Sequence, residues 1–399
     1  MGENLDVAVV GGGPAGAVFA CLAAGDGCRV ALVDPVRGAP RSEGLSPRLQ
    51  GWLARAGLFD ASAMQAEAAA RTSFWGDAPV QANAEMIVER AALDLHLRRM
   101  AQAAGARIVT GTGQPLPGRV ELAEGGVLAA RFVIDARGRR AHRARPGARR
   151  GPATIAIGAA LRLAPDQGPG SRIVPLDQGW LWLACRAGGT GWVQLVLDAA
   201  DPRGRSPEAR LAEALSDARP CLPPELEVGP GLLIRDATPV LAAPAGDLAV
   251  IPIGDAASAM DPLSGHGMFW AVSSALAATA VRRTLQRRDD PENRDLALRF
   301  LAQRHADVYP RQARLGRDFI RAQPGRLHLP FWSRRAAFPD NEPLDTGEAE
   351  PRIARRIVVE DGVLAEAEVV VTPHAPAGLS WIGTERAADL LRRARAGRS

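Results

Sequence analysis

LDVAVVGGGPAG, residues 5–16, is an apolar run that enters a Gly-x-Gly-x-x-Gly turn. A helix of small residues follows, and a second apolar run, RVALV at 29–33, ends on Asp34. A strand, turn, helix, strand and acidic residue in this order predict a dinucleotide-binding α/β unit. The carboxylate of Asp34, 18 residues beyond the last glycine of the turn, can accept hydrogen bonds from a ribose 2′-OH.

Each small residue of the turn has its own expected role. Gly11 permits the tight turn, Gly13 lets a pyrophosphate approach the backbone, and Gly16 lets the helix pack close to the strand. Pro14 and Ala15 open the helix, whose free N–H groups and positive dipole end attract phosphates. We also expect a positive φ at Gly13, a conformation that would strain any other residue.

Four other segments indicate which dinucleotide is bound. Residues 131–138, RFVIDARG, form a strand that ends in an Asp-x-x-Gly turn. Residues 248–268, LAVIPIGDAASAMDPLSGHGM, combine a buried strand, a Gly-Asp turn and a Pro-Leu-Ser-Gly loop, and a helix of small residues follows. Two shorter fragments, RSEGLSP at 41–47 and ERAALD at 89–94, lie between the first turn and these segments.

In this order the motifs resemble the flavoprotein superfamily of aromatic hydroxylases, tryptophan halogenases and geranylgeranyl reductases, over about residues 5–320. The resemblance implies FAD rather than NAD. In that superfamily the Gly-Asp-Ala-Ala segment contacts the ribityl chain and pyrophosphate, and the next helix begins at the isoalloxazine. Asp255 would therefore bond a ribityl hydroxyl, although it could equally serve as a helix N-cap. Beyond the first turn and Asp34, the implied FAD contacts are Arg41, Arg90, Asp135, Gly138, Gly254, Asp255, Pro262, Gly265, Gly267 and Met268.

Composition sets the class of protein. The 399 residues are 47% hydrophobic, enough for a large core, but no run of about 18 apolar residues predicts a membrane helix. The N-terminus passes directly into the nucleotide strand without a signal-peptide pattern, so we expect a cytoplasmic protein. The four cysteines lack a Cys-x-x-Cys spacing and are expected to be free thiols in a reducing compartment. The six histidines show no ligand spacing, so no metal site is expected.

All basic side chains are arginines, since the sequence contains no lysine, and this bias together with abundant Ala, Gly and Pro is typical of a GC-rich bacterial genome. The net charge of +5 gives little support to nucleic-acid binding. Seven of the arginines fall within residues 137–150. This segment is either a solvated loop or a dock for an acidic partner or a pyridine-nucleotide phosphate, because guanidinium pairs with carboxylate and phosphate.

We therefore expect an α/β fold, with a Rossmann-type FAD-binding domain, an interleaved antiparallel-sheet substrate domain and a small C-terminal α+β domain. Strand-like runs at 154–163, 180–185 and 192–197 predict the antiparallel sheet. An Asp-Gly pair at 361–362 predicts a hairpin in the tail. The expected bounds are 1–70, 86–150 and 230–323 for the FAD-binding domain, 71–85 and 151–229 for the substrate domain, 324–352 for a linker and 353–399 for the C-terminal domain.

The superfamily supports several reactions, and the fold does not choose among them. Its halogenases need a lysine, which this chain lacks, so halogenation in that form is excluded. WLWLAC at 180–185 holds half of the halogenase Trp-x-Trp-x-Ile-Pro motif, but the favoured interpretation is an alternating strand with two aromatics on one face. The leading interpretation is a single-component hydroxylase, in which reduced FAD and O₂ give a C4a-hydroperoxide that an aromatic ring attacks. No second Gly-x-Gly-x-x-Gly is present, so NAD(P)H binds transiently or another electron donor reduces the flavin.

The Pro-Leu-Ser-Gly-His-Gly loop at 262–267 is the expected place of the chemistry. Its backbone N–H groups, with Ser264 and Gly265, would face the reactive edge of the flavin. His266 is the titratable side chain of this loop and could hold a proton of the peroxide or the substrate near pH 7. The alternative is a loop histidine that bonds only to backbone.

A narrower resemblance comes from GDAASAMDPLSGHGMFWA at 254–271 together with the extra C-terminal domain. Both are similar to the flavoproteins that mature tryptophylquinone enzymes, such as the one that serves quinohemoprotein amine dehydrogenase. The resemblance implies that the substrate is a Trp side chain in a partner protein, a quinoprotein subunit. The alternatives are a flavin reductase of the geranylgeranyl reductase type and a non-catalytic FAD-binding partner protein.

Overall fold

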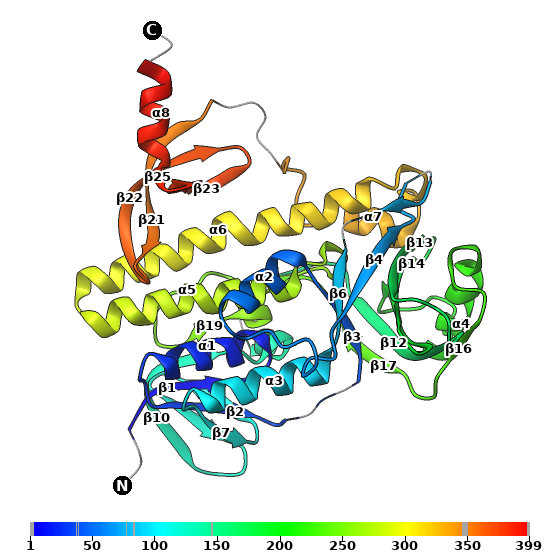
Figure 1. The fold of residues 1–399 in the computed structure, drawn as a ribbon, viewed down its shortest axis with the longest axis horizontal. Coiled ribbons are helices and arrows are strands. Elements are labelled where there is room, and N and C mark those ends of the chain that lie inside the picture. Colours follow the sequence, from blue (N-terminus) through cyan, green and yellow to red (C-terminus); the bar gives the residue numbers. More distant parts are fainter. Residues whose placement is uncertain are drawn as a thin grey trace.

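The computed structural model shows two sheets joined by long helices, with a small domain at one end (Figure 1). The residues that the structure describes are 4–36, 38, 40–76, 78–82, 84–144, 147–344 and 350–396.

The first sheet is built on the predicted nucleotide unit. Its central strand β1 (Leu5–Val10) is flanked by parallel neighbours on both sides, and Val7 to Val9 are fully buried. The parallel strands stand in the order β7 (Arg107–Thr110), β2 (Val30–Asp34), β1, β10 (Val127–Asp135) and β19 (Ile251–Pro252). The antiparallel strands β9 (Arg119–Leu122) and β8 (Gly113–Leu116) extend it from the start of β10.

Helix α1 (Pro14–Gly25) packs between α3 (Arg90–Ala103) and α5 (Gly267–Arg287) (Figure 1). Its alanines are buried, so the three helices approach closely and share one apolar core with the sheet. Because α1 and α5 both begin near the carboxyl ends of the parallel strands, their N-termini point toward the second sheet.

The second sheet is mostly antiparallel, as the strand-like runs predicted. Its order is β16 (Leu226–Val228), β12 (Thr154–Leu163), β15 (Thr190–Asp198), β14 (Gly179–Arg186), β13 (Gly170–Leu176), β4 (Glu67–Ser73), β6 (Glu85–Glu89) and β3 (Ser42–Leu45). Strand β17 (Leu233–Asp236) pairs with β12, and β5 (Val80–Gln81) with β4. Helix α4 (Pro207–Asp217) packs on one face through a shared apolar cluster. Strands β3, β4 and β6 lie mostly in the segments 1–70 and 86–150 that were expected to form the FAD-binding domain, yet they belong to the second sheet. The domain bounds stay a prediction.

The described residues before the tail include two packed helices. Helix α6 (Pro291–Arg321) runs along α5 and reaches the second sheet, where the short helix α7 (Pro330–Ala336) follows (Figure 1). Trp332 of α7 is fully buried, and its Nε1 donates to the Leu176 carbonyl at 3.0 Å. The linker expected over 324–352 therefore contains a packed helix. Its aromatic residues Phe331 and Trp332 are buried against the second sheet, a long-range contact that the Pro and Gly content of the segment does not predict. The remaining elements are α2 (Pro47–Arg55) and a small sheet of β11 (Arg149–Arg150), β18 (Val240–Leu241) and β20 (Ser258–Ala259).

The tail forms the expected small α+β unit. Strands β21 (Arg352–Glu360) and β22 (Val363–Thr372) make a hairpin whose turn residues Asp361 and Gly362 both have positive φ, as a type I′ turn requires. The Leu364 N–H donates to Thr284 Oγ1 of α5 at 2.9 Å, so the hairpin is anchored on the body of the protein. The unit is completed by β23 (Ala375–Leu379), β24 (Trp381–Ile382), β25 (Glu385–Arg386) and α8 (Ala387–Ala396).

Over the described ranges, no helix has both the length and the apolar character needed to cross a membrane.

Candidate active site

A cleft of about 760 Å³ lies between the two sheets. One wall comes from the first turn, the loop before β3 and the residues that precede α5. The opposite wall is the face of the second sheet. The predicted FAD contacts that line this cleft are Gly13, Pro14, Ala15, Arg41, Arg90, Gly138, Gly254, Asp255, Pro262, Gly265, Gly267 and Met268.

The glycines of the first turn differ in their surroundings. Gly11 has φ +108°, and a Cβ there would lie 2.2 Å from the Ala136 carbonyl oxygen. A Cβ on Gly16 would lie 1.9 Å from the Gly11 carbonyl oxygen. Both glycines are therefore needed for close backbone packing. Gly13 has an ordinary φ of −71°, so the expectation of a positive φ is wrong, and its space is open except for Arg90 Nη2 at 3.5 Å.

Two predicted acids hold the loops rather than line the cleft. Asp34 accepts hydrogen bonds from the backbone N–H groups of Gly12 at 2.6 Å and Val36 at 2.7 Å, so it braces the turn. Asp135 is 1% exposed. Its carboxylate accepts hydrogen bonds from Arg137 Nε at 2.9 Å and from Arg137 Nη2 at 3.0 Å. This pair holds the Arg137 side chain at the cleft. A contact of either acid with FAD stays a prediction.

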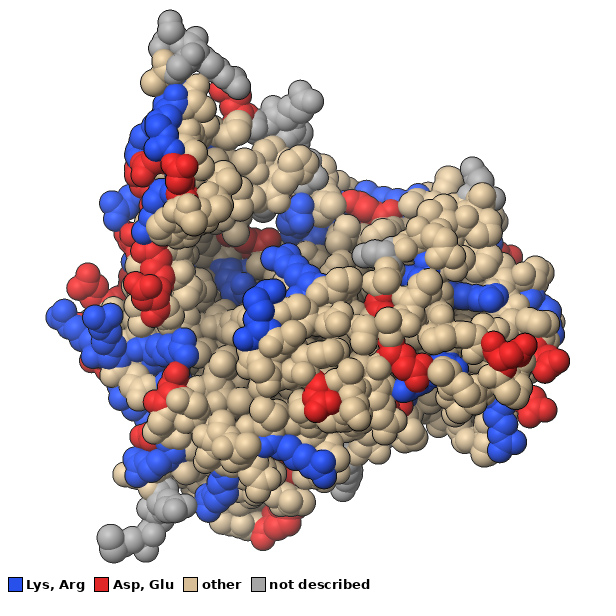
Figure 2. All heavy atoms as spheres, in the orientation of Figure 1, with Lys and Arg blue, Asp and Glu red and all other residues tan. Residues whose placement is uncertain are grey.

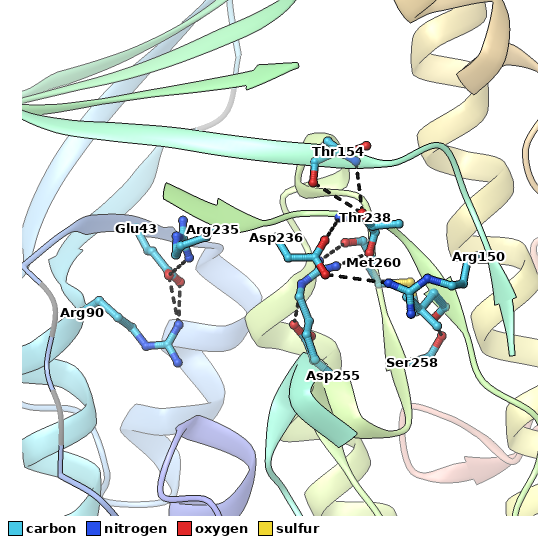
Figure 3. A network of polar contacts seen from close by, with 12 residues as sticks. Glu43, Arg90, Arg150, Thr154, Arg235, Asp236, Thr238, Asp255, Ser258 and Met260 are labelled. Atoms are coloured by element: carbon cyan, nitrogen blue, oxygen red, sulfur yellow. Dashed lines mark hydrogen bonds and ion pairs between the residues drawn. The ribbon is translucent and has the colours of Figure 1, made fainter. Parts of the chain in front are cut away.

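Asp255 lies in a one-turn 3-10 helix, Gly254–Ala256, whose N-cap is Ile253. The alternative role of Asp255 as an N-cap is therefore not realised. Its Oδ2 lies 3.4 Å from Arg139 Nε, and Arg139 also donates to the Met260 carbonyl at 2.8 Å (Figure 3). The carboxylate is thus held at the cleft surface, where 38% of its side chain is exposed to a ligand.

Asp255→Ala is expected to weaken FAD binding by roughly 10- to 100-fold without unfolding the protein, because one charge-assisted hydrogen bond is lost. Titration of the apoprotein with FAD, followed by flavin fluorescence, measures the change. Asp247→Ala, outside the cleft, is the control. Unchanged FAD affinity in Asp255→Ala would remove Asp255 from the cofactor site.

A carboxylate with three arginines was not foreseen from the sequence. Glu43 accepts Arg41 Nε at 2.7 Å and Arg90 Nη1 at 3.0 Å, and Arg235 Nη1 lies 4.0 Å away (Figure 3). Burial alone would raise the pKa of Glu43, but the charges of Arg90, Arg41 and Arg235 outweigh it and lower the pKa from 4.5 to about 2. The cluster joins β3 and β17, both of the second sheet, to α3, which packs on the first sheet.

The wall formed by the second sheet is aromatic. Trp180 and Trp182 alternate along β14, so both lie on one face, and both line the cleft with Ile173 and Ala156. Gln194 adds a polar group, and its Oε1 accepts Arg235 Nη2 at 2.6 Å. This wall offers a flat apolar surface for a planar ring.

The Pro262–Gly267 loop lines the cleft through Pro262, Leu263, Gly265 and Gly267. Gly265 has φ +63°, and both it and Gly267 line the cavity, whereas Ser264 and His266 lie behind them. Ser264 Oγ donates to the Asp261 carbonyl at 3.0 Å and braces the turn. The half-buried His266 is the N-cap residue of α5, and its Nδ1 has no hydrogen-bond partner among the described residues. Burial, with the charges of Arg71 and Arg48, lowers the pKa of His266.

The arginine-rich segment 137–150 faces the cleft with its first three arginines. Arg137, Arg139 and Arg140 line the cleft. Arg149 donates to the Pro339 carbonyl, and Arg150 lies 3.8 Å from Asp236. The side chains of Arg143 and Arg145 lie outside the described residues. The interpretation as a solvated loop therefore does not hold for Arg137 and Arg139, whereas Arg140, Arg149 and Arg150 are exposed.

Comparison with known proteins agrees with this architecture. A sequence profile of the FAD binding domain matches residues 4–116. The chain is similar, at 34% identity and a TM-score of 0.80, to peptidyl tryptophan dihydroxylase QhpG, which is essential for tryptophylquinone cofactor biogenesis; the match covers all of this chain and 94% of that one. The fold also matches the flavin-dependent halogenase CmlS (TM-score 0.74, 18% identity, 94% and 86% covered) and the myxobacterial chondrochloren halogenase CndH (0.64, 21%, 84% and 86%). No curated protein matches the sequence.

The cleft fits the cofactor that this fold implies. The opening above Gly13, the N-terminus of α1 and the N-terminus of α5 are placed to hold a phosphate chain and a flavin ring along one wall. The full-length match to QhpG, with the FAD binding domain, identifies the chain as an FAD-dependent monooxygenase, an enzyme that hydroxylates its substrate. Within this class the chain belongs to the family of peptidyl tryptophan dihydroxylase QhpG.

Proposed function

We propose that this enzyme hydroxylates the indole ring of a tryptophan in a partner protein, a quinoprotein subunit, during biogenesis of a tryptophylquinone cofactor. The observation that carries the proposal is the apolar wall opposite the flavin-binding loops, which is formed by the indoles of Trp180 and Trp182 together with Ile173. The similarity to QhpG over the full chain supports it. Seven arginines in the lining do not suit an apolar tunnel for an isoprenoid chain, so the reductase alternative is not favoured.

The bound flavin, once reduced, supplies the oxygen-activating chemistry, with O₂ as co-substrate. This chain's residues bind the flavin, orient the ring and exclude water. The Gly265 and Gly267 backbone forms the surface under the reacting edge, and the indoles of Trp180 and Trp182 hold the substrate ring parallel to the sheet face. Tight packing of these aromatic groups keeps water from the reacting atoms.

His266 is the proposed proton carrier. Its lowered pKa keeps the imidazole neutral at pH 7, so Nδ1, which has no partner among the described residues, can accept a proton. Ser264 accepts the His266 N–H at 3.4 Å and so positions this residue. The carrier role predicts that activity falls as pH drops and His266 becomes protonated.

The reductant is NAD(P)H bound transiently, or another electron donor. Arg140 is exposed at the cleft and has no acidic partner among the described residues, which suits a phosphate of the pyridine nucleotide.

An acidic partner could dock on Arg149 and Arg150 beside the cleft. The tail is a weaker candidate, because its arginines alternate with acids on the face that Figure 2 shows, and Arg392 pairs with Glu368 at 2.7 Å. Deleting the tail would also expose α5, on which the tail hairpin packs, so a loss of activity could come from either change. Arg150→Glu changes only the docking surface and is the variant used.

Mass spectrometry of the purified partner protein tests the proposal. We expect the wild type, with a reductant and O₂, to add oxygen to one tryptophan of the partner and to leave free tryptophan unmodified. Arg150→Glu should keep its FAD and slow the modification several-fold, more so at low salt. Arg162→Glu, exposed on β12 away from the cleft, is the matched control. Efficient turnover of free tryptophan, or no oxygen added to the partner, would contradict the proposal.

A further inference from the structure

The substrate half of the cleft contains hydrogen-bond donors that no described residue satisfies. Arg71 of β4 lines the cavity, and its guanidinium has no hydrogen bond or ion pair within the described part of the chain. The Gln194 Oε1 is occupied by Arg235, which leaves the amide N–H₂ as a donor.

The acids of the cleft, in contrast, are engaged. Ser171 Oγ donates to Glu85, Arg41 and Arg90 bind Glu43, and Arg139 lies beside Asp255. Because the carboxylates already have cations or donors while these donors have no acceptor, the cavity favours a ligand that carries acceptors and negative charge.

The strand register places Arg71 beside the aromatic wall. Arg71 is paired with Ser171 in the parallel β4–β13 ladder, and Ile173, two residues on, is paired with Trp182. Alternation along β13 puts all of these side chains on the same face of the sheet. The arginine therefore stands two strands, about 10 Å, from the tryptophan strand.

Arg71 also reaches the flavin-facing loop. A Cβ on Gly265 would lie 3.8 Å from Arg71 Nη1. At this position the charge of Arg71 adds to burial in lowering the pKa of the adjacent His266. The cation thus lies between the aromatic wall and the loop where the ring must react.

We infer that Arg71 receives a carboxylate that the substrate carries beside its target indole, and that this contact fixes which ring edge meets the flavin. The inference rests on the proposed function and names the substrate class more closely: an indole with an acidic neighbour rather than a neutral one. A planar guanidinium binds a carboxylate through two parallel hydrogen bonds, so it sets orientation as well as affinity.

Two small probes that differ only in charge test this. Indole-3-propionate and indole-3-propionamide are titrated into the FAD-loaded protein, and binding is followed through the flavin absorption spectrum. The wild type is expected to prefer the propionate by about 10- to 100-fold, the effect of one charge-assisted contact. Arg71→Gln should lose this preference, keep its FAD content and keep its affinity for the amide, while Arg71→Lys retains part of the preference.

Arg162→Gln, an exposed arginine of the same sheet outside the cleft, is the control and should behave as the wild type. Equal binding of the two probes to the wild type would contradict the role of Arg71, but it would still support an indole-binding site in the cleft. Loss of FAD in Arg71→Gln assigns the residue to the cofactor and also overturns it. No saturable response to either probe also overturns the role of Arg71, whereas the proposed function is decided separately, by oxygen addition to the tryptophan of the partner protein.

Discussion

Gly13→Trp is expected to yield a folded protein that purifies without FAD. The backbone at Gly13 is extended, with φ −71° and ψ −178°, so any residue can adopt it. The space above its Cα is open to the cleft, and the nearest atom is Arg90 Nη2. An indole there would occupy the position of the pyrophosphate. Several charge-assisted hydrogen bonds, of about 1.5–3 kcal/mol each, would be lost together, which lowers FAD affinity by at least about three orders of magnitude.

The flavin absorbance of the purified variant measures occupancy, and circular dichroism shows whether the fold is kept. Gly25→Ala, at the end of the same helix with open space around it, should keep full FAD. Gly16→Ala is the opposite control, because its Cβ would overlap the Gly11 carbonyl and destabilise the fold itself. A yellow Gly13→Trp protein with normal FAD content would show that the first turn does not hold the pyrophosphate.

The parts of the fold that the sequence predicted are those set by local pattern. The strand, turn and helix at 5–25 follow from apolar periodicity and glycine spacing, and the 154–163 strand matches β12 residue for residue. The tail hairpin follows from one Asp-Gly turn, because a type I′ geometry admits few other residues.

The predictions that failed, or could not be made, depend on contacts between distant residues. Pro and Gly content predicts a linker at 324–352, yet within it Phe331 and Trp332 are buried and pack helix α7 onto the second sheet. Gly13 resembles the other glycines of its turn, and only the path of the backbone shows that Gly11 alone has the positive φ.

The candidate site was foreseen on its cofactor side and not on its substrate side. The FAD residues come in motifs, and most of the predicted ones line the cleft. Arg71 belongs to no motif, and it reaches the cleft because β4 pairs with β13 about a hundred residues later. Arg235 arrives in the same way through β17 and β12. Sequence periodicity identifies such strands but not which of them become neighbours.

Glu43 is the residue whose loss we expect to cost the most stability. Its carboxylate, 20% exposed, lies among Arg41, Arg90 and Arg235 and holds two walls of the cleft together. Glu43→Gln keeps the shape but leaves three guanidinium groups facing one another with little water. Breaking a desolvated charge cluster by removing one partner typically costs about 3–5 kcal/mol, so we expect a loss of this size at pH 7 and weaker FAD binding.

The pH dependence gives a second readout of the same cluster. The folded-state pKa of Glu43, about 2, lies below the ordinary 4.5, so its contribution to stability is fully present above about pH 4.5 and is lost as the pH falls toward 2. The difference between these pKa values corresponds to about 3 kcal/mol, in line with the expected cost of the substitution. Glu43→Gln should therefore be less stable at pH 7 and lose less stability than the wild type between pH 5 and 3.

Urea unfolding of the two proteins at pH 7, 5 and 3, each with FAD in excess, measures this difference. Glu121→Gln is the matched control, because Glu121 pairs with Arg119 at the surface, where both side chains are about half exposed. A surface pair of this kind contributes at most about 1 kcal/mol, so the control should follow the wild type at every pH. If Glu43→Gln unfolds at the same urea concentration as the control at pH 7, the carboxylate does not hold the arginines together, and the two walls of the cleft must be joined by their strand pairing and apolar contacts alone.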